Sequence, residues 1–589
     1  MVSDPILLFL IVTSVALLTL GTLTTRLPGT SGSFLTTMFC GLGALLCLPP
    51  LITRAETVVL TLPLGPPGLS LHFALDPLSL AFLILTFLIG TAIAAFQAAG
   101  TQVPRSDGIR TTAFSIGGTA LALLAADGMV LTLGLATISA SICPRAIAAP
   151  FMILAAVCLL TPPGYPPRFD AIRTAPADPL RAAATLILTV TAIATMLWPR
   201  SIKHSWTTDT LTAGLAVPLG SYLLLRLTAD LSATAIQPWC GFIPLLGGCI
   251  VAAVQAWRAA AAPDIDTAAN ALIGRQSGLS TASIGLFLIA RAADLPAAAS
   301  FALNATFLAI IGSALAGTLT VLAAHAIGAG AGTFRLARLG GLIHLMPGTS
   351  AALSAGLLAL SALPPGLGFF GMWLSFQSIL SAPRTGGLIS QLPLALLAAS
   401  LALTAALATT ASIRIAGIAI LGRPRTPRGA GARETASTVR SILLTLAGAS
   451  ILAGILPNQI LWLLAEPAAH DLLGTALPSA PAGSPGYTVL VIIALAALTT
   501  TGAMVLPKRA RREAKIAGPW LDGFPPEIGL PFGEPSAQSA GAGFLPDLPR
   551  PRIPTRVRLP NLPPLPKISG PWLILIAFAV LLLAIGVSG

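Results

Sequence analysis

Apolar stretches long enough to cross a bilayer recur along nearly the whole chain, separated by short clusters of Pro, Gly, Arg and Asp. A transmembrane helix needs roughly 20 mostly apolar residues. Of the 589 residues, 55% are hydrophobic and 9% are charged, and the mean hydropathy is +0.88. A water-soluble fold cannot bury that much apolar surface. The sequence therefore predicts an all-α, polytopic membrane helix bundle of about 14 to 17 transmembrane helices.

Changes in composition divide the chain into five parts. Residues 1–70 are expected to form N-terminal transmembrane helices, and residues 71–430 the transmembrane core. Residues 431–506 are expected to add C-terminal transmembrane helices, and residues 570–589 a final one. Between these last two, residues 507–569 form a basic loop rich in Pro and Gly. Because Lys and Arg beside membrane spans favour the cytoplasmic side, this loop is expected to be cytoplasmic.

Two long apolar stretches are harder to interpret. Residues 297–327 contain Gly312 and Gly317, which favours a broken helix. Residues 388–421 are longer than one span needs, so a tilted helix, a broken helix or two helices would fit. Shorter runs at 278–289, 349–363 and Leu367–Leu380 are each expected to be a separate helix.

The net charge of +13 and the six cysteines exclude some classes of protein. The basic residues lie in loops beside spans and not on one soluble face interleaved with aromatics, so a nucleic-acid partner is not expected. The cysteines lie in apolar stretches and have no metal-ligand spacing, which indicates small buried side chains. We therefore expect no metal and no cofactor in this chain.

Three segments carry a family resemblance. Residues 71–87 read LHFALDPLSLAFLILTF, and residues 211–226 read LTAGLAVPLGSYLLLR. The most specific segment, residues 332–380, contains GGLIHLMPGT followed by LPPGLGFFGMW. Together they resemble the antiporter-like membrane subunits of NADH:quinone oxidoreductase (complex I) and Mrp antiporters. ILGRPRTPR at 420–428 and PWLDGF at 519–524 are similar to the hydrogenase-type branch, that of the hydrogenase-4 and formate hydrogenlyase membrane subunits.

The resemblance implies an antiporter-like core at residues 71–430 and proton transport through membrane-embedded Glu, Lys and His. Buried groups of this kind can have pKa values that allow proton uptake and release. This sequence has no Glu between Glu56 and Glu434, and its only Lys before residue 507 is Lys203. In the motif register, the family's relay positions are occupied by Ala136, Pro218, Ser313 and Gly317. The resemblance thus implies a degenerate relay.

Charged residues that remain in or near predicted spans are candidates for an ion path or polar seam. They are Asp76, Asp127, Arg226, His325 and Arg414. Asp76 is also well placed to cap a helix that begins at Pro77. The arginines cannot relay a proton by losing one, so they are expected to pair, to snorkel or to hold a polar seam open. His325 could titrate or could simply hydrogen-bond to a neighbouring helix.

These observations predict a non-catalytic membrane subunit of a respiratory or hydrogenase-type oxidoreductase, with a structural or coupling role. Its partners would be the lipid bilayer and the other membrane and soluble subunits of that complex, which would hold the redox centres. The location would be the bacterial inner membrane. The alternative is a working cation/proton antiporter that uses Asp76, Asp127 and His325. An unrelated multi-span transporter would leave the motif of residues 332–373 unexplained.

Overall fold

The computed structural model describes most of the chain up to residue 473. The described residues are 3–23, 29–54, 56–63, 70–100, 106–142, 148–161, 167–174, 178–197, 206–231, 238–382, 388–422, 424–473 and a few between 494 and 502. The predicted basic loop at 507–569 and the predicted last helix at 570–589 lie outside the described residues. The five-part division therefore stays a prediction.

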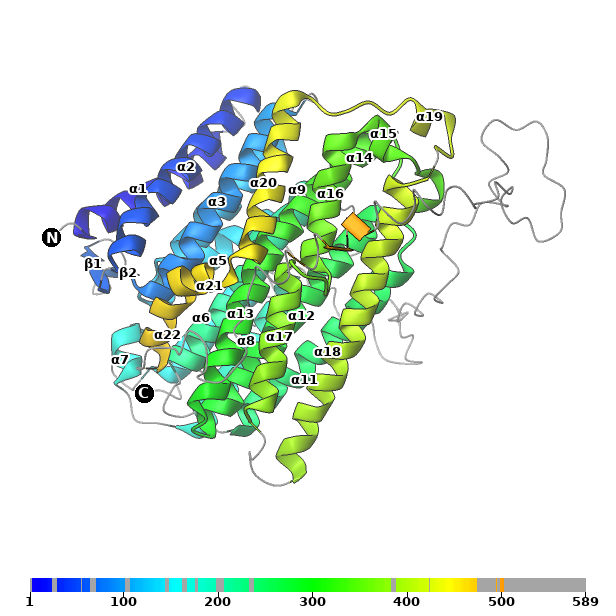
Figure 1. Ribbon diagram of the computed structural model, residues 1–589. Helices are drawn as coiled ribbons and strands as arrows, with labels where there is room; N and C mark the ends of the chain where they lie inside the picture. Colours follow the sequence, from blue (N-terminus) through cyan, green and yellow to red (C-terminus); the bar gives the residue numbers. More distant parts are fainter. Residues whose placement is uncertain are drawn as a thin grey trace, which may run out of the picture.

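The described chain is a bundle of membrane-length helices (Figure 1). Within the described residues, eight helical stretches are long and apolar enough to span a bilayer. By element they are α1 (Ser3–Leu23), α2 (Gly29–Thr53), α3 (Pro77–Ala99), α9 to η3 (Trp206–Asp230), α11 (Phe242–Ala261), α13 to α14 (Pro296–Ala331), α18 (Leu388–Ile415) with η7 (Ala416–Ile420), and α20 (Ser437–Ile455). The prediction of an all-α, multi-pass membrane bundle is confirmed.

Further helices complete the bundle. The shorter apolar ones are α5 (Gly128–Ile142), α6 (Ala148–Leu160), α8 (Pro179–Leu197), α16 (Pro347–Leu360) and α17 (Leu367–Leu380). Two more polar helices, α4 (Ser106–Leu123) and α12 (Ile265–Ala292), lie among them. Short helical turns link these elements: α7 (Phe169–Arg173), η4 (Pro238–Gly241), η6 (Leu336–Arg338), α15 (Leu342–Leu345), α19 (Pro427–Ala430), α21 (Pro457–Ile460), η8 (Leu461–Ala465) and α22 (Glu466–Leu473).

The two ends of the bundle differ. At one end, β1 (Val58–Leu62) and β2 (Leu71–Leu75) form an antiparallel hairpin, in which Val58 pairs with Leu75. This hairpin end also holds α7 and the first turns of α3 and α5, and it lies at the lower left of Figure 1. At the other end, backbone hydrogen bonds join residues 263–265 to residues 334–336, and Gly341 to Leu421. We call this the arginine-rich end, for Arg258, Arg335, Arg338, Arg425, Arg428, Arg433 and Arg440.

The helix break predicted within residues 297–327 is wrong. The chain from Pro296 to Ala331 is one continuous helical span, in which η5 (Ser313–Gly317) is a single π-helical turn. The glycines serve close packing instead: a Cβ at Gly312 would lie 3.3 Å from Leu367, and one at Gly317 would lie 3.1 Å from Ile273. Small residues allow such approach between membrane helices without interrupting either one.

The interruption lies between α16 and α17, and the prediction of two separate helices at 349–363 and Leu367–Leu380 agrees with it. Residues 361–366, which include Pro364 and Pro365, are non-helical and join the two elements. Helix α16 packs on α14 and α20, whereas α17 packs on α13. Because α13 and α14 are consecutive parts of one span, α16 and α17 together make one crossing with a break near its middle. Proline explains the position, since it cannot continue the hydrogen bonding of a helix interior.

One further expectation needs correction. The helix predicted at 278–289 begins at Ile265, where Asp264 occupies the N-cap position, and it ends at Ala292. Of the alternatives for the stretch at 388–421, the structure has a single helix, α18, that ends in the π-helical turn η7. The sequence pattern did not predict the first half of α12, because buried polar side chains interrupt its apolar spacing. The added half brings Arg275 into the bundle interior.

Candidate functional site

Asp76 lies at the start of α3, where its carboxylate caps the helix. Its Oδ1 accepts a hydrogen bond from the backbone N–H of Ser79 at 2.8 Å, and Pro77 follows in the first turn. The capping role predicted for Asp76 is confirmed. The side chain is only 3% exposed, so its second oxygen needs a partner inside the protein.

Arg226 supplies that partner. Its Nη2 lies 2.5 Å from Asp76 Oδ2, and its Nη1 lies 2.7 Å from Asp230 Oδ2. Its Nε donates to the Tyr222 hydroxyl at 3.2 Å. At 1% exposure, the guanidinium is shielded from water and its charge is balanced by protein groups alone.

Arg173, from α7, completes what we call the Asp76 cluster: Asp76, Arg173, Arg226 and Asp230. It binds Asp230 through two hydrogen bonds of 2.9 and 2.7 Å, in the bidentate geometry that a guanidinium favours. With two carboxylates and two guanidiniums, the cluster is electrically neutral. A guanidinium does not release its proton in proteins, so the cluster holds charge in place and does not pass protons along.

Asp127 lies apart from this cluster, at the start of α5. Its carboxylate accepts from the backbone N–H of Val130 at 2.7 Å and from that of His72 at 2.8 Å, which fastens α5 to β2. Burial raises the pKa of Asp127 above its usual range, although these hydrogen bonds oppose the shift. The His72 ring faces Arg168 at 3.2 Å, and burial together with this arginine lowers the pKa of His72.

His325 and Arg414 lie toward the other end of the bundle. The His325 ring stacks on the indole of Trp206 with centroids 4.9 Å apart. Arg414 donates to the carbonyl oxygens of Ala260 and Ala262, at the C-terminal end of α11. A cation is favourable there because the last carbonyls of a helix carry partial negative charge. Of the five candidates, only Asp76 and Arg226 meet.

The predicted relay positions fall in two regions. Ala136 lies in α5, whereas Pro218, Ser313 and Gly317 lie where η2 (Thr212–Ala216) and α10 (Val217–Leu224) pack against η5. Apolar side chains fill the space beside this contact, namely Ala213, Val217, Ala269, Ile273 and Val321. The correspondence of these positions to the family's relay stays a prediction. The chemistry of their surroundings suits helix packing and not ion transfer.

Sequence reasoning missed Arg275, which is fully buried near the middle of α12. Its Nη2 donates to the carbonyl oxygen of Leu360 at 2.5 Å and to Gln276 Oε1 at 3.0 Å. Leu360 is the last residue of α16, so Arg275 caps the helix end at the break between α16 and α17. Asp264 was the available signal, because an N-cap residue there extends the helix to include Arg275.

A row of buried polar side chains continues along α12 beyond Arg275. Ser280 Oγ lies 3.3 Å from Ser221 Oγ of α10, and Ser283 Oγ lies 3.2 Å from Ser375 Oγ of α17. Gln276, Ser280 and Ser283 share one helix face by their spacing. With Ser221 and Ser375 they form what we call the polar seam.

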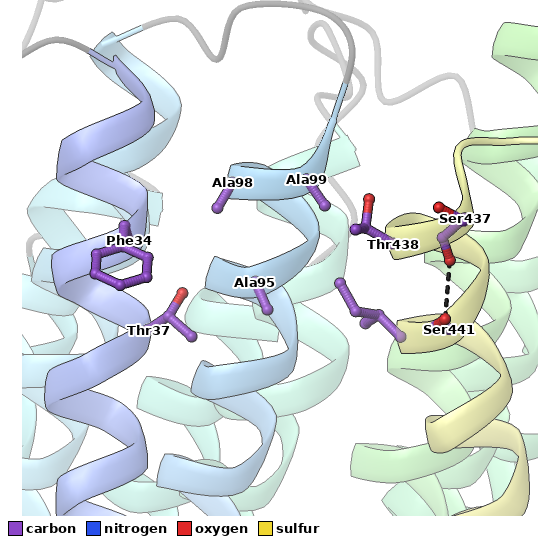
Figure 2. A pocket seen from close by; sticks show the side chains of 9 residues that line it. Phe34, Thr37, Ala95, Ala98, Ala99, Ser437, Thr438 and Ser441 are labelled. Atoms are coloured by element: carbon purple, nitrogen blue, oxygen red, sulfur yellow. Dashed lines mark hydrogen bonds between the residues drawn. The ribbon is translucent and has the colours of Figure 1, made fainter.

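Two hollows lie between the described helices. A groove of about 500 Å³ opens between α2, α3 and α20 (Figure 2), where Ala95, Ala98 and Ala99 face Phe34 and Thr438. Its lining has no ionisable group. A far smaller cavity, about 10 Å³, adjoins Gln276, Ser283 and Ser375 of the polar seam. In the part of the chain that the structure describes, no cluster of His, Cys, Asp and Glu could hold a metal ion.

The fold is similar to that of membrane subunits of the Mrp and complex I assemblies. Over 80% of its length, the chain is similar to a subunit in the structure of the Mrp complex from Dietzia sp. DQ12-45-1b, with a TM-score of 0.64, 18% identity and 98% of that subunit covered. A subunit of respiratory complex I from Thermus thermophilus gives a TM-score of 0.60 at 19% identity, over 79% of this chain and 99% of that one.

In sequence, the chain is similar to hydrogenase-4 component B of Escherichia coli, at 28% identity over 258 residues, which are 44% of this chain and 38% of that protein. It is 29% identical to formate hydrogenlyase subunit 3 of the same organism over 230 residues, which are 36% of this chain and 37% of the relative. The chain thus spans well under half the length of the curated relatives it matches. No protein-family model matches it. The predicted resemblance is confirmed.

Proposed function

We propose that this chain is a membrane subunit of a multi-subunit redox complex of the hydrogenase or complex I type, in which it packs or couples neighbouring subunits without a complete proton relay of its own. The observation that carries the proposal is the state of the charged groups inside the bundle. Arg226 and Arg275 are fully buried, permanently charged and held by protein groups. A relay needs groups that gain and lose protons in turn.

The three residues of the alternative antiporter mechanism support this choice. Asp76 is paired with Arg226 and caps α3, and Asp127 caps α5. Both carboxylates therefore have structural roles at the hairpin end. His325 lies in α14 and stacks on Trp206. A proton path across about 30 Å of hydrocarbon needs groups between these points that can gain and lose protons. The space between them instead holds hydroxyls, an amide and an arginine whose charge is fixed.

The proposal includes a location and partners. The chain would lie in the bacterial inner membrane with residues 507–569 in the cytoplasm, as its basic composition favours. Flavin, nickel or iron–sulfur centres would belong to soluble partner subunits, and this chain would bind no cofactor. Lipid would cover the apolar outer faces of helices such as α1 and α18, where Phe9, Leu392 and Ile413 are each more than half exposed.

Affinity purification of the tagged chain from its native membrane in mild detergent tests the proposal. We expect mass spectrometry to find soluble redox subunits in fixed ratio to the chain, with the absorption of their metal or flavin centres. A chain that emerges alone, or only with copies of itself, would contradict the proposal. An unrelated membrane protein with the same tag serves as the control.

Proton flux in proteoliposomes tests the antiporter alternative. A working antiporter would exchange cations for protons and would lose that exchange in His325→Ala. The matched control is His344→Ala, which changes an exposed histidine in α15. We expect neither variant to alter flux, because the parent chain should carry little. Exchange abolished by His325→Ala alone would overturn the proposal.

A further inference from the structure

Arg275 carries a charge that the protein does not neutralise locally. Its guanidinium contacts the Leu360 carbonyl, the Gln276 amide oxygen and, at 3.9 Å, the Met372 sulfur. These partners are polar or polarisable but uncharged, and Nε has no hydrogen-bond partner among the described residues. Arg226, by contrast, has two carboxylates within 2.7 Å.

The described helices that pack most extensively on α12 do not supply a carboxylate either. The described elements that pack most extensively on α12 are α10, α11, α13, α14, α16, α17, α18, η4 and η5. None of them contains Asp or Glu, whereas α11 carries Arg258, α14 carries His325 and α18 carries Arg414. The acid within α12 itself, Asp266, lies nine residues before Arg275, or about 13 Å along the helix. The interior around Arg275 is therefore electropositive.

The polar seam leads to this charge. Tyr222 contacts the Asp76 cluster through Arg226, and the preceding residue of α10, Ser221, contacts the Ser280 hydroxyl of α12. Ser283, Ser375 and Gln276 then border the cavity of about 10 Å³, close to what a single water molecule occupies. Hydroxyls and amides can accept and donate hydrogen bonds to water. The seam is thus a route along which protons or small cations could enter from the hairpin end.

We propose that Arg275 is an electrostatic barrier, which stops protons and other cations from crossing the bundle along the polar seam. A fixed positive charge in a low-dielectric interior repels cations strongly, whereas the same charge does not repel anions. The proposal rests on the proposed function in one respect: a subunit without a working relay must stay sealed in an energised membrane. It concerns the purified chain and needs no partner subunit.

Proton leak through Arg275→Gln in proteoliposomes tests the barrier. Glutamine keeps a donor for the Leu360 carbonyl and removes the charge. A pH-sensitive dye inside the vesicles reports proton entry under an imposed potential, and a chloride-sensitive dye in parallel vesicles reports anion leak. We expect the proton leak to rise roughly tenfold or more and the chloride leak to stay unchanged. The selective change identifies an electrostatic effect.

The matched control is Arg291→Gln in the same helix. Arg291 also donates to a backbone carbonyl, that of Ala229 at 2.5 Å, but it lies in the last turn of α12. We expect this variant to seal as well as the parent chain. An unchanged proton leak in Arg275→Gln would overturn the barrier. So would an equal rise in proton and chloride leak, which indicates damaged packing.

A second variant keeps the test decisive if Arg275→Gln does not fold. Arg275→Lys retains a charge, but a buried amine can lose its proton where a guanidinium cannot. The barrier then predicts a proton leak that grows as the pH on both sides of the vesicle is raised. A leak that does not change with pH, or a chain that seals at every pH, would contradict it. Copurification of redox subunits is a separate measurement, so the two proposals can fail independently.

Discussion

Three arginines of the helix bundle, the buried Arg226 and Arg275 and the half-buried Arg414, are stabilised in three different ways. Arg226 is neutralised by Asp76 and Asp230, Arg414 binds helix-end carbonyls, and Arg275 relies on one carbonyl and one amide. The chemistry of the partner decides the consequence of each. An arginine paired with carboxylates holds helices together. An arginine held only by neutral groups leaves an uncompensated positive potential in the protein interior.

Removal of Arg226 should therefore be strongly destabilising. Arg226→Met leaves the buried Asp76 carboxylate with only the Arg173 guanidinium, 3.9 Å away, as a counter-charge, whereas Asp230 keeps its hydrogen bonds to Arg173. We expect a loss of about 3–5 kcal/mol in the free energy of unfolding. The apparent melting temperature in detergent, followed by scanning fluorimetry, reports the change. Arg173→Met is the control, because that side chain is 39% exposed and Asp230 keeps Arg226. Its loss should stay near 1 kcal/mol or below. Equal shifts in both variants would contradict this account of the cluster.

At the scale of elements, small residues decide how closely helices approach, and proline decides where a helix stops. Helices α11 and α12 form the most extensive contact in the bundle. Their glycines meet in pairs: a Cβ at Gly248 would lie 2.4 Å from the Ala282 nitrogen and 2.6 Å from the Gly278 carbonyl oxygen. Residues 361–366 interrupt the α16–α17 crossing, and Gly454 of α20 packs against the Pro365 carbonyl.

Adjacent glycines in α11 give a matched test of this packing. Gly248→Ala should separate α11 from α12 and lower stability by about 1–3 kcal/mol, because the clash is with backbone atoms. Gly247→Ala has nothing within 4 Å of the new methyl group and faces outward. It should stabilise the helix by up to about 1 kcal/mol. We expect the melting temperature to fall in Gly248→Ala and to rise in Gly247→Ala. A fall of similar size in both variants would show that the Gly248 contact does not determine the packing of α11 on α12.

At the scale of the whole molecule, charge is distributed unequally between the two ends. The hairpin end holds the Asp76 cluster and the Arg54–Glu466 pair, where arginines are matched by acids. At the arginine-rich end, the described loops carry several arginines against few acids, including Glu434, whose carboxylate binds the Gly348 N–H and the Thr349 hydroxyl at the start of α16. Excess Lys and Arg favour retention in the cytoplasm.

The arginine-rich end should accordingly face the cytoplasm. The variants Arg433→Cys and Val59→Cys each add one thiol to the native cysteines, at exposed positions on opposite ends. A membrane-impermeant maleimide added to intact cells should label Val59→Cys at once and Arg433→Cys only after permeabilisation. The parent chain measures background labelling of the native cysteines. The reverse pattern would refute the orientation.

The membrane class and the family likeness could be predicted from the sequence because they depend on local properties. Span-length apolar runs require a bilayer whatever their partners, and the Asp76 cap involves residues only three apart. The spaced Gly, Pro and aromatic residues at 332–380 carried the resemblance for the same reason. Their spacing is retained along the chain itself.

What only the tertiary structure decided depends on residues far apart in the sequence. It paired Arg226 with Asp76, placed the helix break at residues 361–366 and left 297–327 continuous. It also buried Arg275 against Leu360, 85 residues away. The neighbouring helices decide whether an arginine is neutralised, and whether a glycine breaks a helix or allows another helix to approach. The sequence shows where a charged residue lies along the chain, and the packing determines its partners and therefore its role.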